Sequence, residues 1–196
     1  MDEFIVKIEQ HRDEFFRFIK RNVWDTGVAE DVFSQGVLAA YENRAKYTPG
    51  TNFRAWMYRI LLNKCYVANR ETGRAFDSLD HPAAREATAK ETADYGDLIR
   101  DPAALLDQCG DEVYRAFKGL STAQRACILL RGVEKFSYQE IAEIMKIPAG
   151  TVMTHLARGR KKLRLELTEY AKETGVIRRF PKAHAATPKA GSEGSA

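Results

Sequence analysis

Residues 137–164 read SYQEIAEIMKIPAGTVMTHLARGRKKLR and predict two helices joined by a tight turn. Ser137 and Glu140 have the spacing of a capping box, in which side-chain oxygens satisfy the free amides that open a helix. Pro148 suits the first turn of a second helix, because it has no amide hydrogen to lose. The stretch from about Leu120 to Leu167 is therefore predicted to contain a helix-turn-helix.

The second helix of this motif is predicted to have an apolar side and a polar side. Helical spacing places one set of residues against the rest of the domain: Val152, Leu156, Gly159, Leu163 and Leu167. On the other side, the first turns could meet base edges in a DNA major groove, and the cationic run up to Arg164 could lie near phosphates. A bare basic run is usually a solvated helix face, but the capping box, the turn and the preceding helix together favour DNA binding.

Residues 4–70 predict three further helices. Apolar residues keep mostly to helical spacing from Phe4 to about Asn22, from Ala29 to Tyr47 and from Asn52 to about Arg70. Breakers stand between them, at 25–27 and 48–51. Three apolar stripes with short turns describe a compact helical bundle.

The third of these helices and the turn before it combine cations with aromatic rings. Glu42 is the single acid in residues 42–70, against the cations Arg44, Lys46, Arg54, Arg59, Lys64 and Arg70. The interleaved rings are Tyr47, Phe53, Trp56, Tyr58 and Tyr66. Single-stranded nucleic acid is bound by cations that follow its backbone and by rings that stack on its bases. An aromatic stripe at helical spacing is more often core, so the interior of the bundle is the competing role for these rings.

The composition changes after the third helix. Residues 71–108 hold nine acids against four bases, with two prolines and many alanines, which is typical of a linker. Its length favours two tethered domains over one continuous core. We therefore expect an all-α chain of two small helical domains, at 1–73 and 107–175, joined by a flexible acidic linker at 74–106 and followed by a disordered basic tail at 176–196.

Catalytic and metal-binding chemistry is not indicated. The three cysteines form no CxxC pair, no Gly-rich phosphate loop is present, and no ligand or triad spacing relates His11, His81, His155 and His184. We predict no cofactor, no metal site and no enzymatic activity, and we expect Cys65 and Cys127 to be small buried apolar residues.

Charge and hydropathy limit where the chain works. The formal net charge of +4 is compatible with a nucleic-acid partner but does not by itself indicate one. The first residues lack the pattern of a signal peptide, and no apolar run approaches the roughly 18 residues that cross a bilayer. A cytoplasmic protein without membrane insertion is expected.

Several segments resemble, in order and spacing, the extracytoplasmic-function group of bacterial sigma-70 factors, the minimal group 4 kind with two conserved domains. They are AEDVF at 29–33, NFRAWMYRILLN at 52–63 and LSTAQR at 120–125, followed by the helix-turn-helix. The match covers nearly the whole predicted folded part. Residues 150–160, GTVMTHLARGR, further resemble the subgroup often controlled by redox-sensing, zinc-containing anti-sigma factors.

The resemblance implies a chain that binds core RNA polymerase, directs it to promoters and helps to open the duplex. The sigma region 2-like domain would dock on the clamp of the largest polymerase subunit through Asp31, Gln35 and Leu38. The same domain would hold the −10 element as it melts, through Phe53, Arg54, Trp56, Arg59, Asn63, Arg70 and Arg74.

The sigma region 4-like domain would approach the flap region of the polymerase and read the −35 element as duplex DNA. The residues carried over for this role are Thr151, Met153, Thr154, His155, Arg158, Arg160, Lys161 and Lys162. The resemblance also implies an anti-sigma factor that buries the DNA-facing surfaces, and a place at the bacterial nucleoid.

The sequence departs from the family pattern at several of these positions. The family usually has Gln-Glu where Ser34 and Gln35 stand, an Arg where His155 stands, and a larger residue than Ala157. Because a neutral His cannot make the bidentate guanine contact of an Arg, the −35 preference of relatives does not transfer. His155 could contact a base, a phosphate or neither.

Two other functions stay open at this point. A helix-turn-helix regulator would bind duplex DNA without being a polymerase subunit, but it leaves segment 52–63 unexplained. A helical adaptor would use the basic helix on a protein or an acidic lipid. Promoter-specific transcription with core polymerase separates the three interpretations.

Overall fold

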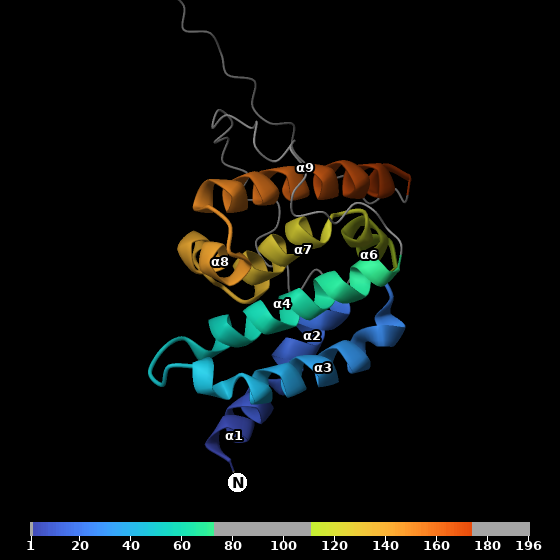
Figure 1. Cartoon of the computed structure of the whole chain (residues 1–196). Coiled ribbons are helices and arrows are strands. Elements are labelled where there is room, and N and C mark those ends of the chain that lie inside the picture. Colours follow the sequence, from blue (N-terminus) through green and yellow to red (C-terminus); the bar gives the residue numbers. More distant parts are fainter. Residues whose placement is uncertain (1, 73–110, 174–196) are drawn as a thin grey trace, which may run out of the picture.

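The structure is a computed structural model that describes residues 2–72 and 111–173. Within these residues every regular element is helical, and the helices form two domains stacked on one another (Figure 1). The all-α, two-domain prediction is confirmed. The predicted linker at 74–106, the predicted tail at 176–196 and Arg74 lie outside the described residues.

The first domain contains four α-helices. They are α1 (Glu3–Gln10), α2 (Arg12–Asn22), α3 (Ala29–Glu42) and α4 (Phe53–Glu71), with short 3-10 turns η1 (Thr26–Val28) and η2 (Arg44–Lys46) on either side of α3. The single helix expected from Phe4 to Asn22 is wrong, because the chain turns at His11, whose amide bonds to the carbonyl of Ile8 at 3.1 Å.

The helix expected to reach Tyr47 also ends earlier, at Glu42. Asn43 stops it, because its side-chain amide donates to the carbonyl of Ala39 at 2.8 Å. By contrast, α4 has nearly the predicted bounds. Asn52 caps its start, and the side-chain oxygen accepts from the amide of Ala55 at 3.1 Å.

The second domain carries the helix-turn-helix. It consists of α6 (Asp111–Lys118), α7 (Thr122–Ile128), the π-turn η5 (Leu129–Val133), α8 (Tyr138–Met145) and α9 (Ala149–Glu173). The predicted capping box is present, since Ser137 accepts from the amide of Glu140 and Glu140 accepts from the amide of Ser137. Pro148 stands just before α9 rather than inside it, and its carbonyl accepts from the amides of Thr151 and Val152.

The apolar side predicted for α9 is the side that packs. Val152, Leu156 and Leu163 are buried, and Leu167 packs against the same core. Gly159 allows close approach to α7, because a Cβ at this position would lie 2.8 Å from Cδ1 of Ile128. These contacts fix the helix-turn-helix as a rigid unit.

Helix α4 is the shared middle layer of the molecule. It packs on α2 and α3 on one side and on α7 and α8 on the other, while α9 forms the outermost layer of the second domain (Figure 1). Leu61 of α4 lies against Gly36 of α3, whereas Tyr58 meets Phe136 of the second domain.

The buried side chains of both domains therefore form one cluster. The expectation that the two domains would not share a continuous core is wrong, because α4 buries side chains on two faces. A sequence window records how apolar a helix is, but not how many neighbours divide its surface.

Candidate nucleic-acid interface

The predicted duplex-reading residues lie together on the outer helix. Met153 is 53 % exposed, and Arg158, Lys161 and Lys162 are exposed as well, while Thr151, Thr154, His155 and Arg160 are partly buried. Thr154 uses its hydroxyl within the helix, donating to the carbonyl of Gly150 at 3.0 Å. The arrangement places a cationic surface with a few uncharged side chains at its N-terminal end, as groove reading requires.

The turn between α8 and α9 sets the angle of the outer helix. Lys146 adopts a left-handed conformation with φ of 56°, and its amide bonds to the carbonyl of Ala142. The amide of Ile147 bonds to the same carbonyl at 3.1 Å. This pair of bonds closes α8 and turns the chain sharply into α9.

The surroundings of His155, a candidate base contact, affect its pKa. Burial, and then the neighbouring charge of Arg158, lower the pKa of His155 below its usual value. The imidazole is therefore neutral near pH 7. A neutral ring can donate one hydrogen bond and accept another, but it adds no charge opposite a phosphate.

The residues predicted to bind polymerase share one face of α3. Asp31, Gln35 and Leu38 are all exposed, at positions one helical turn apart. Leu38 is 58 % exposed, and Tyr41 extends the same side of the helix at 37 %. A solvent-exposed leucine beside the carboxylate of Asp31 and the amide of Gln35 is typical of a protein-binding surface.

The two rings predicted to touch the −10 element belong to an aromatic cluster. Phe53 is only 8 % exposed, and its ring lies 5.6 Å from that of Phe4 and 5.4 Å from that of Tyr47. Trp56 is partly exposed at the edge of this cluster, 5.8 Å from Phe4 and 5.6 Å from Tyr47. Phe53 therefore packs inside the domain, and Trp56 is the one of these two rings that has exposed surface for a contact with DNA.

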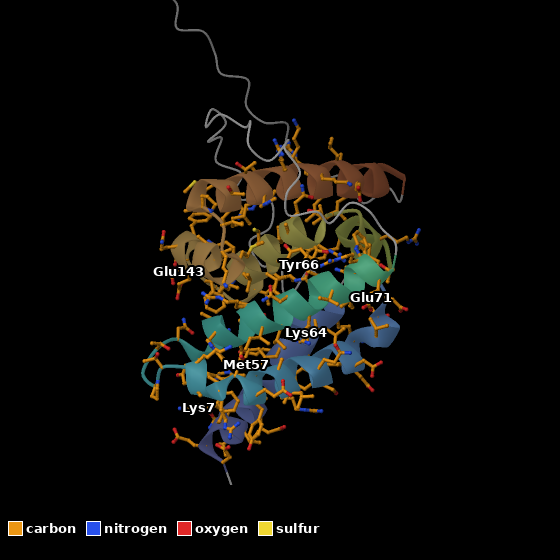
Figure 2. The ribbon with its side chains drawn as sticks, viewed as in Figure 1. Lys7, Met57, Lys64, Tyr66, Glu71 and Glu143 are labelled. Atoms are coloured by element: carbon orange, nitrogen blue, oxygen red, sulfur yellow. The ribbon has the colours of Figure 1, made fainter. Side chains whose placement is uncertain are left out.

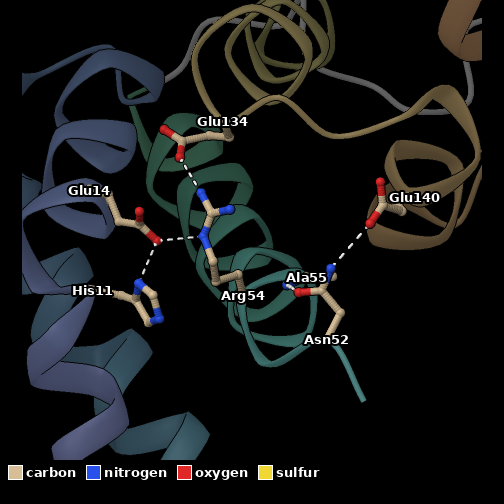
Figure 3. A network of polar contacts seen from close by, with 7 residues as sticks. All are labelled: His11, Glu14, Asn52, Arg54, Ala55, Glu134 and Glu140. Carbon is tan, nitrogen blue, oxygen red and sulfur yellow. Dashed lines mark hydrogen bonds and ion pairs between the residues drawn. The ribbon is translucent and has the colours of Figure 1, made fainter. Parts of the chain in front are cut away.

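Arg54, predicted to contact −10 DNA, is held between two carboxylates (Figure 3). Its Nε lies 2.8 Å from Glu14 of α2, and its Nη2 lies 3.0 Å from Glu134 of the second domain. Burial lowers the pKa of Arg54, but the bond to Glu14 and the nearby charges raise it overall, so the guanidinium stays charged. The side chain is 32 % exposed.

Two more residues at the start of α4 reach the second domain. Nη2 of Arg59 donates to the backbone oxygen of Glu143 at 2.7 Å, and the side-chain amide of Asn52 donates to Glu140 at 3.2 Å. Asn63 and Arg70, the remaining predicted −10 contacts within the described residues, are exposed.

The other end of the interdomain contact is a polar cluster around Trp24. The guanidinium of Arg125 lies 3.9 Å from the centroid of the Trp24 ring. Asn69 accepts from the amide of Trp24 at 2.8 Å and donates to the hydroxyl of Thr122 at 2.7 Å. Sequence reasoning missed this cluster. Its signal is the presence of Asn22, Asn69 and Arg125 at buried positions of otherwise apolar helix faces.

Comparison with known proteins matches both domains to one family. Residues 8–75 match the model of Sigma-70 region 2, and residues 110–163 match Sigma-70, region 4. The RNA polymerase sigma factor CarQ of Myxococcus xanthus is 30% identical over 171 residues, which are 86% of this chain and 91% of that protein. The chain belongs to the sigma-70 family.

Other relatives place this sigma factor in the extracytoplasmic-function group. The ECF RNA polymerase sigma factor SigE of Mycolicibacterium smegmatis is 27% identical over 168 residues, covering 85% of the chain but only 62% of the length of that relative. The fold resembles the sigma factor RpoE of Bartonella quintana, solved in complex with the anti-sigma factor NepR, with a TM-score of 0.63 and 24% identity over 86% of this chain and 98% of that one. Sigma factors are noncatalytic transcription initiation factors. Membership of this family therefore favours a function together with RNA polymerase over a regulator that binds duplex DNA alone.

Two further findings concern the described part of this sigma factor. Cys65 and Cys127 are buried free thiols, as expected, and burial raises the pKa of each to about 12. Across residues 2–72 and 111–173, no cluster of three or more His, Cys, Asp or Glu side chains is placed to hold a metal, and no helix there has the length and apolar character to cross a membrane.

Proposed function

We propose that this sigma factor binds core RNA polymerase, directs it to promoters through −10 and −35 elements, and carries no catalysis of its own. One observation supports this most strongly: regions 2 and 4 occur in order on one chain, and region 4 presents an exposed cationic helix of a helix-turn-helix. In this proposal the polymerase performs the chemistry and the sigma factor positions it.

Each surface has a separate task in this proposal. The α3 face with Asp31, Gln35 and Leu38 docks on the polymerase clamp, and region 4 lies at the flap. Helix α9 reads the −35 duplex through the eight residues from Thr151 to Lys162 named above. Helix α4 holds the opened −10 strand with Arg54, Trp56, Arg59, Asn63 and Arg70 and, beyond the described residues, Arg74, while Phe53 packs against the ring of Trp56 inside the domain.

In vitro transcription tests the proposal directly. The full chain is mixed with bacterial core polymerase and a library of genomic promoter fragments, and the transcript ends are sequenced. Starts at discrete sites that share a pair of upstream elements support the proposal. Failure to bind core polymerase in a gel-filtration assay overturns it.

A pair of variants tests the polymerase-docking face. Leu38→Asp places a charge on α3, and Leu165→Asp makes the same change on α9, where the leucine is 60 % exposed. We expect Leu38→Asp to weaken core binding at least tenfold and Leu165→Asp to weaken it less, because Leu165 lies on region 4 rather than on the face proposed to dock on the clamp. Equal effects would remove α3 from the proposed interface.

We also propose an anti-sigma partner for this chain, since the similar Bartonella quintana factor was solved in complex with one. Segment 150–160 favours the redox-sensing zinc type. Affinity purification of the tagged chain from its own cells, with zinc measured in any bound partner, tests this. A zinc-free partner would reject the narrower type.

A function at promoters would place the chain in the bacterial cytoplasm at the nucleoid. Fluorescence imaging of a fusion protein checks this location.

A further inference from the structure

The exposed surface of α9 changes in chemistry along the helix. Its first nine residues, AGTVMTHLA at 149–157, include no Lys, Arg, Asp or Glu, whereas residues 158–164 include five cations. Figure 2 shows α9 as the outermost layer of the second domain, with side chains that project away from α7 and α8. The surface of this helix therefore has an uncharged part followed by a cationic part.

We infer that the uncharged part reads the C5-methyl groups of thymine in the −35 duplex, and that Met153 makes the contact. This inference rests on the proposed function, because it names the base chemistry that the same helix would recognise. It assigns base preference to a residue of α9 that carries no charge and no hydrogen-bond donor.

The residue types at 149–157 exclude most of the pairings by which a helix reads the major groove. Guanine is read by the donors of Arg or Lys, adenine by the amide of Asn or Gln, and cytosine by the carboxylate of Asp or Glu. None of these residue types occurs in this segment. Thymine differs from the other bases, because an apolar side chain can recognise it through its C5-methyl group.

The polar side chains of this segment offer single hydrogen bonds at most. Thr154 donates its hydroxyl proton to the carbonyl of Gly150 at 3.0 Å, so this proton is used inside the helix. Burial and the charge of Arg158 lower the pKa of His155, and a neutral imidazole has one N–H to donate. Thr151, partly buried in the first turn, has one hydroxyl. None of these groups can make the two-point contact that identifies a purine.

Met153 is the large apolar side chain that this segment exposes, at 53 %. Small residues flank it: a Cβ on Gly150 would have no atom within 4 Å, and Ala157, one turn further on, is exposed. These small residues allow the backbone of α9 to come close to the floor of a groove. The unbranched thioether of Met153 adapts its shape readily, and contact with a methyl group removes apolar surface of both from water.

The cationic part of α9 supplies the affinity that a methyl contact alone lacks. Arg158, Lys161 and Arg164 are exposed and follow Met153 within about three helical turns. Cations placed near phosphates give binding that does not depend on sequence. A change at Met153 should therefore alter base preference while most of the affinity for duplex DNA is kept.

Replacement of thymine by uracil tests the inference, because it removes the C5-methyl group and keeps the base pairing. Holoenzyme made from the full chain and core polymerase first selects promoter-length duplexes from a random pool. Each thymine of the selected −35 element is then replaced in turn by uracil, and binding is measured by fluorescence anisotropy for the wild type, Met153→Ala and Leu165→Ala. Leu165 is the matched control, because it is 60 % exposed on the same helix but lies about 18 Å further along the axis.

We expect a selected element with A·T pairs, in which uracil at one or two positions weakens wild-type binding about fourfold, the effect of removing one methyl group from an apolar contact. Leu165→Ala should show the same loss, and Met153→Ala should show none. At a contacted position, 5-methylcytosine paired with guanine should bind more tightly than cytosine paired with guanine.

Three results would overturn the inference: an element of G·C pairs alone, uracil without effect at every position, or an equal effect of uracil in Met153→Ala. If Met153→Ala lowers helical content by circular dichroism, Met153→Gln replaces it under the same criteria. This variant keeps the length of the side chain and adds an amide that pairs with adenine, so its own selected element should gain adenine at the contacted position.

The proposed function and the methyl contact fail in different ways. A chain that does not bind core polymerase rejects the proposed function. The selection and the uracil comparison are then carried out with the full chain alone, where loss of binding on uracil that depends on Met153 still supports the methyl contact. Binding without any sequence preference, or no binding to duplex DNA, overturns the contact as well.

Discussion

Gly159 of α9 packs against Ile128 of α7, and replacing it with alanine should be harmful only while the δ-methyl of Ile128 is present. A Cβ at position 159 would lie 2.8 Å from Cδ1 of Ile128, where carbon atoms normally stay about 3.5–4.0 Å apart. The next neighbours, Cβ of Gln124 at 3.4 Å and Cγ1 of Ile128 at 3.7 Å, are close to ordinary contacts. One methyl group therefore decides the outcome.

The magnitude follows from two opposing effects. Alanine gains about 1 kcal/mol over glycine inside a helix. Overpacking of a core costs typically about 1–3 kcal/mol, and Ile128 is only 3 % exposed. Gly159→Ala should thus lower the free energy of unfolding by about 0–2 kcal/mol. Ile128→Val removes Cδ1 and costs about 0.5–1.5 kcal/mol alone, but in that background Gly159→Ala should stabilise by up to about 1 kcal/mol.

Urea unfolding of the wild type, both single variants and the double variant measures this cycle. We expect a coupling free energy of about 1–3 kcal/mol in favour of the double variant. Distant sites that do not interact are additive within about 0.5 kcal/mol. Additivity within that limit would show that α7 and α9 are not packed as described.

Three other predictions concern capping and DNA contact. Ser137→Ala should cost about 1 kcal/mol at pH 7. Because bonds from Ser137 lower the pKa of Glu140 below 4.5, the stabilisation is present above that value and is lost as the pH falls through the pKa of the folded chain, so urea unfolding near pH 3 should show a smaller loss. Lys161→Ala should reduce the slope of log K against log salt for duplex binding by about 0.9, as for one lost phosphate contact, and an unchanged slope would place Lys161 away from DNA. Trp56→Ala should impair promoter opening, measured by the permanganate reactivity of unpaired thymines, more than it impairs closed-complex binding. Equal loss of both, together with a lower melting temperature, would assign the ring to the core instead.

Local signals in the sequence were enough to predict much of the fold. The Ser137 and Glu140 capping box, the start of α4 at Asn52 and the buried side of α9 all depend on residues within one or two helical turns. The break at His11 and the end of α3 at Asn43 escaped, because single hydrogen bonds decided them and no Gly or Pro stands there. The π-turn from Leu129 to Val133 escaped as well, since it shifts the helical register without changing composition.

The roles of the candidate site residues stay predictions, but the structure shows contacts between these residues that the sequence did not reveal. The exposure of Met153 and Leu38 agrees with surface roles that motif spacing suggested. The contacts of Arg54 with Glu134 and of Asn69 with Thr122 join residues 80 and 53 positions apart. No periodicity within a helix records such pairs, so the sequence could name the groups that would meet DNA without showing that region 4 covers some of them.

The position of α4 between two layers has a consequence for how this protein can diverge. Only Asn63, Val67, Arg70 and Glu71 of this helix are exposed, whereas α9 has an outer face that contacts no other described helix. Substitutions on α4 must satisfy neighbours on two sides as well as a promoter, while those on the outside of α9 answer to DNA alone. Among orthologues, we expect preference at the −35 element to drift faster than preference at the −10 element, so that new regulons arise mainly through the outer helix.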